Sequence, residues 1–69
     1  MRPISLAAAR VDANLTQKDV AEKLKVSTNT IVAWEKGVTE PKASQVQELC
    51  RLYNRPLDDI SMPLASSNN

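Results

Sequence analysis

The chain has 69 residues, of which 42% are hydrophobic and 3% aromatic, and its formal net charge is +1. This length allows one small domain, which buries only about 60% of the surface that its unfolded chain exposes. The single cysteine, Cys50, excludes an intrachain disulfide, and the absence of histidine excludes histidine metal sites and nucleophile–histidine catalytic sites. We therefore expect no enzyme activity, no metal site and no cofactor. Because no apolar run resembles a membrane span or a signal-peptide core, we expect a soluble, cytoplasmic protein.

The first helix is expected from about Ile4 to Ala13, in a fold that should be all-α because strand formers are few. The inward face of this helix follows helical spacing, with Leu6, Ala9, Arg10 and Ala13. Arg10 therefore lies on an apolar face, where an unpaired charge is costly. Glu35 is the natural partner, although Arg10 can instead extend to solvent and leave Glu35 as a surface charge.

A second helix is expected to begin after Thr16 and to stop near Leu24. The side chains of Thr16 and Asp19 are spaced to accept hydrogen bonds from each other's backbone N–H groups, as in a capping box. The inward stripe of this helix consists of Val20, Ala21 and Leu24.

A third helix is expected between Ser27, which is a suitable N-cap, and Gly37, which takes a left-handed conformation at low cost. Its inward stripe contains Ile31 and Trp34. The segment that joins it to the second helix, Lys25 to Ser27, is too short for a parallel pair and suits two sharply crossed helices. The pattern predicts a helix-turn-helix, and its second helix has small outer side chains: Thr28, Asn29, Thr30 and Ala33.

A fourth helix is marked by residues at helical spacing, namely Val46, Leu49, Cys50 and Tyr53. Its N-cap is either Lys42 or Ser44, and Asn54 should end it. A short fifth helix is expected from Pro56 to Ile60, because acidic residues in a first turn favour the helix dipole. Residues 62–69, MPLASSNN, have little core potential and are predicted to form a flexible C-terminal tail.

The stretch LTQKDVAEKLKVSTNTIVAWEKGVTEP resembles the helix-turn-helix of the phage repressor/Cro family, the lambda-repressor-like and XRE-like regulators. The resemblance covers residues 4–61. It implies a compact five-helix domain over residues 1–61, sequence-specific binding to a double-stranded DNA operator, and the pairing of Arg10 with Glu35. Two positions depart from the family, because Asn14 and Lys25 occupy turns where glycine is usual. Asparagine tolerates such a turn, whereas lysine either strains it or changes its bend.

The resemblance also implies which side chains meet DNA when the third helix enters the major groove. By this resemblance, the residues that read bases lie on the outer face of the third helix and at the start of the second helix: Thr28, Asn29, Thr30, Ala33 and Gln17. Phosphate contacts are carried over to Gln17, Lys18, Ser27, Lys36 and Lys42. The alternative is that these side chains are ordinary solvated or capping groups. With a net charge of only +1, non-specific attraction to phosphate should be modest.

Family members usually bind as homodimers, and the resemblance extends this expectation to the present chain. The dimer surface is expected at the end formed by the fourth and fifth helices, where apolar residues gather: Leu57, Ile60, Met62 and Leu64. These residues can equally complete the core or lie in the tail. An antirepressor or polymerase is a further possible partner of such a regulator, which would lie on the nucleoid when bound to DNA. The main rival is an antitoxin-like or coactivator-like module that uses the same fold to bind a protein.

Overall fold

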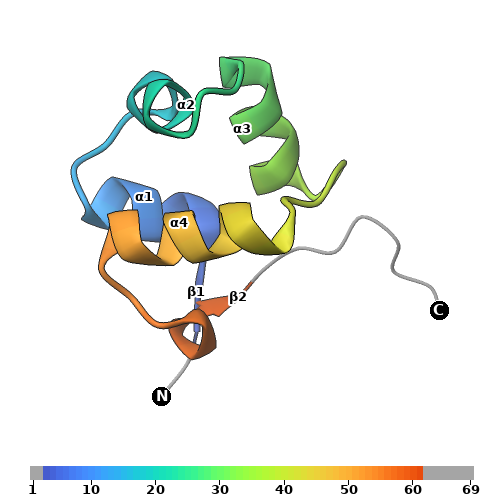
Figure 1. Cartoon of the computed structure of the whole chain (residues 1–69). Helices are drawn as coiled ribbons and strands as arrows, with labels where there is room; N and C mark the ends of the chain where they lie inside the picture. Colours follow the sequence, from blue (N-terminus) through green and yellow to red (C-terminus); the bar gives the residue numbers. More distant parts are fainter. Residues whose placement is uncertain (1–2, 62–69) are drawn as a thin grey trace, which may run out of the picture.

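The computed structural model describes residues 3–61, and its elements form three levels in the view of Figure 1. Helices α1 and α4 form the middle level, α2 and α3 lie above them, and a small β-ladder lies below. The elements in chain order are β1 (Ile4–Ser5), α1 (Leu6–Asp12), α2 (Gln17–Leu24), α3 (Thr28–Lys36), α4 (Ala43–Tyr53), the single 3-10 turn η1 (Leu57–Asp59) and β2 (Ile60–Ser61). The all-α helix-turn-helix class is therefore confirmed.

The expected count of five helices is wrong. Pro56 has extended backbone angles (φ −70°, ψ 160°), and Ile60 is extended again (φ −115°, ψ 125°), so only one 3-10 turn fits between them. Ile60 then pairs in parallel with Ile4, and Ser61 with Ser5. This pairing also moves the start of the first helix to Leu6, where the Ser5 hydroxyl accepts a hydrogen bond from the backbone N–H of Ala8 (3.0 Å).

The core takes residues from every helix and from β2. Its buried members are Leu6, Ala9, Val20, Ala21, Ile31, Trp34, Leu49, Tyr53 and Ile60. Trp34 is therefore a core residue, and Ile60 completes the core rather than remaining on the surface. Leu57, by contrast, is 54% exposed. Met62, Leu64 and the rest of the predicted tail lie outside the described residues.

Two interactions fix the ends of α4. At its start Lys42 occupies the N-cap position, and its backbone N–H donates to the Gln45 side chain at 2.7 Å, so Ser44 is not the cap. At its end Asn54 is left-handed (φ 56°) and terminates the helix, as predicted. Beyond it, the Arg55 guanidinium pairs with Asp12 at 2.5 Å and with Asp59 at 3.8 Å. Arg55 thereby connects the end of α1 to η1.

The turn between α2 and α3 keeps the left-handed geometry that glycine usually supplies. Lys25 has φ 60° and ψ 44°, and the next residue, Val26, donates its N–H to the Ala21 carbonyl at 3.0 Å. The sequence leaves two alternatives for a lysine at this position, a strained turn or a turn with a different bend. The structure shows the strained turn, because Lys25 keeps the left-handed geometry. A side chain in this conformation costs on the order of 1 kcal/mol.

Replacing Lys25 with glycine should relieve this strain. We expect Lys25→Gly to raise the free energy of unfolding by up to about 1 kcal/mol, which is roughly 4–8 °C in Tm for a domain of this size. Thermal and urea unfolding followed by circular dichroism measure the change. Lys23→Gly, placed inside α2, is the control and should lower stability by a similar amount because glycine disfavours a helix interior. A loss of stability in both variants would contradict the strained-turn interpretation.

Candidate nucleic-acid interface

The first turns of α2 and α3 are closed by local hydrogen bonds. In α2 the Thr16 hydroxyl accepts from the Asp19 N–H at 3.0 Å, and the Asp19 carboxylate accepts from the Thr16 N–H at 2.9 Å. The hydrogen bond from the Thr16 backbone lowers the pKa of Asp19 below its ordinary value. In α3 the Ser27 hydroxyl accepts from the Thr30 N–H at 3.2 Å. Both helix starts are thus held rigidly, which a recognition surface requires.

Helix α3 has one buried face and one outward face. Ile31 and Trp34 are 1% and 3% exposed, whereas Thr28 and Asn29 are exposed at the start of the helix. Thr30 and Ala33 are half-buried. The hydroxyls of Thr30 and Ser27 hydrogen-bond to each other at 2.9 Å, so each is already partly occupied. Among the residues expected to read bases, Thr28 and Asn29 are therefore the most accessible.

A single carboxylate joins α1, α2 and α3. Arg10 in α1 donates from Nε to Oε2 of Glu35 in α3 at 2.7 Å, and its Nη1 donates to the Leu15 carbonyl at 2.9 Å. The other carboxylate oxygen, Oε1, accepts from Nε2 of Gln17 in α2 at 2.9 Å. The Arg10 and Glu35 side chains are 14% and 7% exposed. Sequence reasoning placed Gln17 only against DNA and missed its bond to Glu35, because no local pattern relates residues 18 positions apart.

Three lysines expected to meet phosphate come from different elements. Lys18 lies in the first turn of α2, Lys36 ends α3 and Lys42 precedes α4; all three are exposed. Within residues 3–61, none of the three forms an ion pair. Their ammonium groups are therefore available to an external anion.

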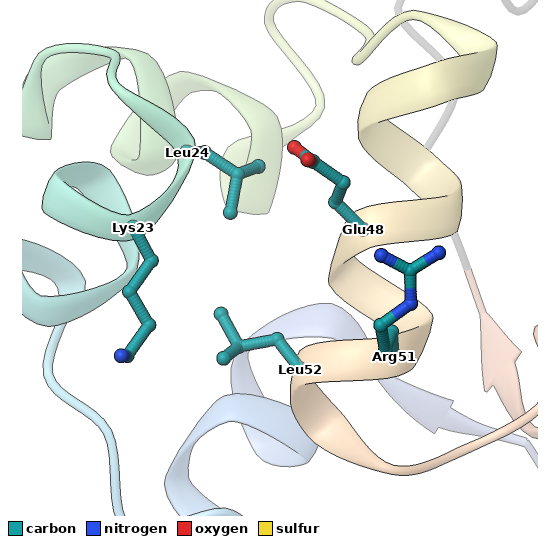
Figure 2. Close-up of a pocket in the computed structure, with 5 residues that line it drawn as sticks. All are labelled: Lys23, Leu24, Glu48, Arg51 and Leu52. Carbon is teal, nitrogen blue, oxygen red and sulfur yellow. The ribbon is translucent and has the colours of Figure 1, made fainter.

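A shallow hollow of about 310 Å³ lies between α2 and α4 (Figure 2). It is lined by Lys23, Leu24, Glu48, Arg51 and Leu52. This volume is at the lower end of the range for small-molecule sites, and none of the lining residues is among the expected DNA contacts. In the described part of the chain no group of His, Cys, Asp and Glu side chains is arranged to hold a metal ion. No helix of that part is both long and apolar enough to cross a membrane.

Comparison with known proteins assigns the family. Residues 6–60 match the sequence profile of the helix-turn-helix family HTH_3. The chain belongs to the helix-turn-helix family. This assignment confirms the resemblance seen in the sequence and points to a DNA-binding regulator rather than an enzyme.

Two curated relatives show the same relationship. The chain is 37% identical over 51 residues to the transcriptional repressor RstR of the cryptic phage CTXphi from Vibrio cholerae, covering 74% of this chain and 46% of the repressor. It is 40% identical over 47 residues to an uncharacterised HTH-type transcriptional regulator of Methanocaldococcus jannaschii, covering 68% of this chain and 71% of that protein. The chain thus spans less than half the length of the phage repressor. No solved structure matches it significantly.

Tyr53 in α4 is a core residue near the Arg10–Glu35 pair. Its buried hydroxyl has no hydrogen-bond partner among the described residues. Burial, reinforced by the nearby Glu35 charge and opposed by Arg10, raises its pKa from 10.0 to about 12. Between pH 10 and 12 the unfolded chain has therefore lost a proton that the folded protein retains. Because the folded state binds more protons in this interval, stability falls as pH rises through it.

Tyr53→Phe should remove this pH dependence. We expect the variant to be at least as stable as the parent at pH 7, because an unsatisfied buried hydroxyl costs about 1–3 kcal/mol. From pH 10 to 12 its free energy of unfolding should decline less steeply than that of the parent. Urea unfolding of both proteins at the same pH values measures the difference in their free energy of unfolding. Titration of the lysines affects both proteins equally and therefore cancels in this difference. Parallel declines would show that Tyr53 ionises normally in the folded state.

Proposed function

We propose that this protein is a sequence-specific, double-stranded DNA-binding transcriptional regulator that inserts α3 into the major groove. The observation that carries this proposal is the exposure of Thr28 and Asn29 on the first turn of a helix whose opposite face is packed into the core. In helix-turn-helix proteins the first turn of the second helix contacts base edges. Membership in the family and similarity to transcriptional regulators support the same function.

The chemistry of the exposed residues suits base readout. The Asn29 amide can donate to N7 and accept from N6 of adenine, which is a bidentate contact. The Thr28 hydroxyl can donate or accept, and its methyl group, like that of Ala33, can contact a thymine methyl. Ser27 and Thr30, whose hydroxyls are partly occupied by each other, are assigned to the margin of the interface, where a phosphate oxygen can accept a hydrogen bond.

Backbone contacts should come from helix starts and from the three exposed lysines. Gln17 is the first residue of α2, where free N–H groups and the positive end of the dipole favour a phosphate. Lys18, Lys36 and Lys42 add three cations around α2 and α3. With so small a net charge, these local features matter more than a general basic field.

We further propose that the protein binds as a homodimer to two half-sites separated by about 34 Å, one turn of the duplex. A single recognition helix buries too little surface for tight specific binding, and Leu57 is exposed beside the end of α4. The dimer would occupy an operator in the cytoplasm, on the nucleoid, and either block or recruit polymerase. Sedimentation of the free protein and of its DNA complex measures the stoichiometry, and one chain per selected site would contradict the dimer.

Asn29→Ala tests base readout. The parent should first be used to select binding sites from random DNA at physiological salt. On the selected site, Asn29→Ala should lose about 1–3 kcal/mol of binding free energy and relax the preference at one base pair. Gln47→Ala, which removes an exposed amide from α4, is the matched control and should bind as the parent does. The readout assignment fails if Asn29→Ala binds selected and random duplexes with parental affinities.

Lys36→Ala tests a phosphate contact. Because a phosphate contact carries no sequence information, the variant should bind selected and random DNA more weakly by a similar factor. The slope of log affinity against log salt should become shallower by about one. Fluorescence anisotropy over a salt series measures both quantities. Lys23→Ala, in the hollow between α2 and α4, is the control, and an equal change of slope in both variants would refute the assignment.

A further inference from the structure

The amide of Gln17 has only one favourable orientation against Glu35. Its Nε2 lies 2.9 Å from Oε1 of Glu35. An ionised carboxylate can only accept hydrogen bonds, so the nitrogen end of the amide must face it. Turning the amide around would place two acceptor oxygens against each other. The carbonyl oxygen and one remaining N–H of Gln17 therefore point away from Glu35.

Glu35 is itself held in place by α1. Arg10 donates to Oε2 at 2.7 Å from Nε and to Oε1 at 3.4 Å from Nη2, while its Nη1 is bound to the Leu15 carbonyl. With 7% exposure of the Glu35 side chain, little water competes for these bonds. The acceptor that faces Gln17 is therefore held in place by α1 rather than mobile on the surface.

This bond links the two helices of the proposed DNA interface. Gln17 is the first residue of α2, and Glu35 lies one residue before the end of α3, the helix that carries Thr28 and Asn29. A glutamine on a helix surface normally samples many rotamers, and ordering it on binding is unfavourable. Gln17 is already ordered in the free protein, so that conformational entropy is lost before DNA arrives.

We propose that Glu35 is a positioning residue for DNA binding: it holds the Gln17 amide in the orientation in which Gln17 contacts the duplex. A phosphate only accepts hydrogen bonds, so the remaining N–H of Gln17 is the group that meets it, and Glu35 keeps the carbonyl from taking that place. The same bond fixes the contact of α2 relative to the base-reading turn of α3. This inference rests on the proposed DNA-binding function and adds a role for a residue that is not itself a DNA contact.

A double-mutant cycle tests the inference. Removing Glu35 alone would leave the Arg10 charge without a counter-ion, so both residues are replaced together, as Arg10→Met with Glu35→Leu. Such apolar replacement of an ion pair usually preserves a fold. Gln17→Met removes the amide at nearly constant size. On the selected site, Gln17→Met should weaken binding about tenfold in the parent and less than about threefold in the background of the pair variant, because there Gln17 is no longer held. Equal losses in both backgrounds would overturn the proposal.

Nuclear magnetic resonance of the free protein provides a readout that does not depend on DNA. In the parent, one of the two Nε2 protons of Gln17 should be shifted downfield and protected from solvent exchange. Both signatures should disappear in the Arg10→Met/Glu35→Leu variant and persist in Glu22→Gln, which neutralises an exposed carboxylate on the same helix. Identical Gln17 side-chain signals in the parent and the pair variant would also overturn the proposal.

The outcomes separate this inference from the function on which it rests. If the parent selects no duplex sequence, the proposed function fails and the positioning role fails with it. If the parent binds selectively and Asn29→Ala weakens that binding, while the Gln17 cycle is additive, the function stands and only the role of Glu35 is refuted.

Discussion

The arrangement of the three N-terminal helices depends on one largely covered carboxylate, that of Glu35. A buried carboxylate is unfavourable unless a cation and hydrogen-bond donors surround it, and Glu35 receives both from Arg10 and Gln17. Since these partners come from α1 and α2, satisfying the charge fixes α3 relative to both. In a chain of 69 residues, whose hydrophobic core is small, such a directional link specifies geometry that apolar packing alone leaves loose.

The second and third helices could be predicted from the sequence because their ends depend on local hydrogen bonds. Thr16 with Asp19, and Ser27 with Thr30, lie within one turn of each other, so their spacing in the sequence is nearly their spacing in space. Gly37 ends α3 with φ 79°, the conformation expected of it. The proposed DNA-binding residues Thr28 and Asn29 were placed from the same local pattern together with the resemblance to the repressor/Cro family.

The features that could not be predicted depend on residues distant in sequence. Ile4 and Ile60 pair at opposite ends of the described chain, and a two-residue strand has no periodicity to detect. The same pairing holds Ile60 and Ser61 in extended backbone and limits η1 to one turn. The residues around Gln17 in the sequence predict only that it is the first residue of a helix. Its bond to Glu35 exists only after α2 and α3 have crossed.

The β1–β2 ladder also places the two ends of the described chain side by side, on the far side of α1 and α4 from α2 and α3 in Figure 1. A fluorophore, an affinity handle or a linker to a solid support attached near residue 3 or residue 61 would begin there, away from the first turn of α3. Immobilisation through either end should therefore leave the recognition helix facing solution. Attachment at residue 3 or residue 61 thus leaves the outer face of α3 unobstructed.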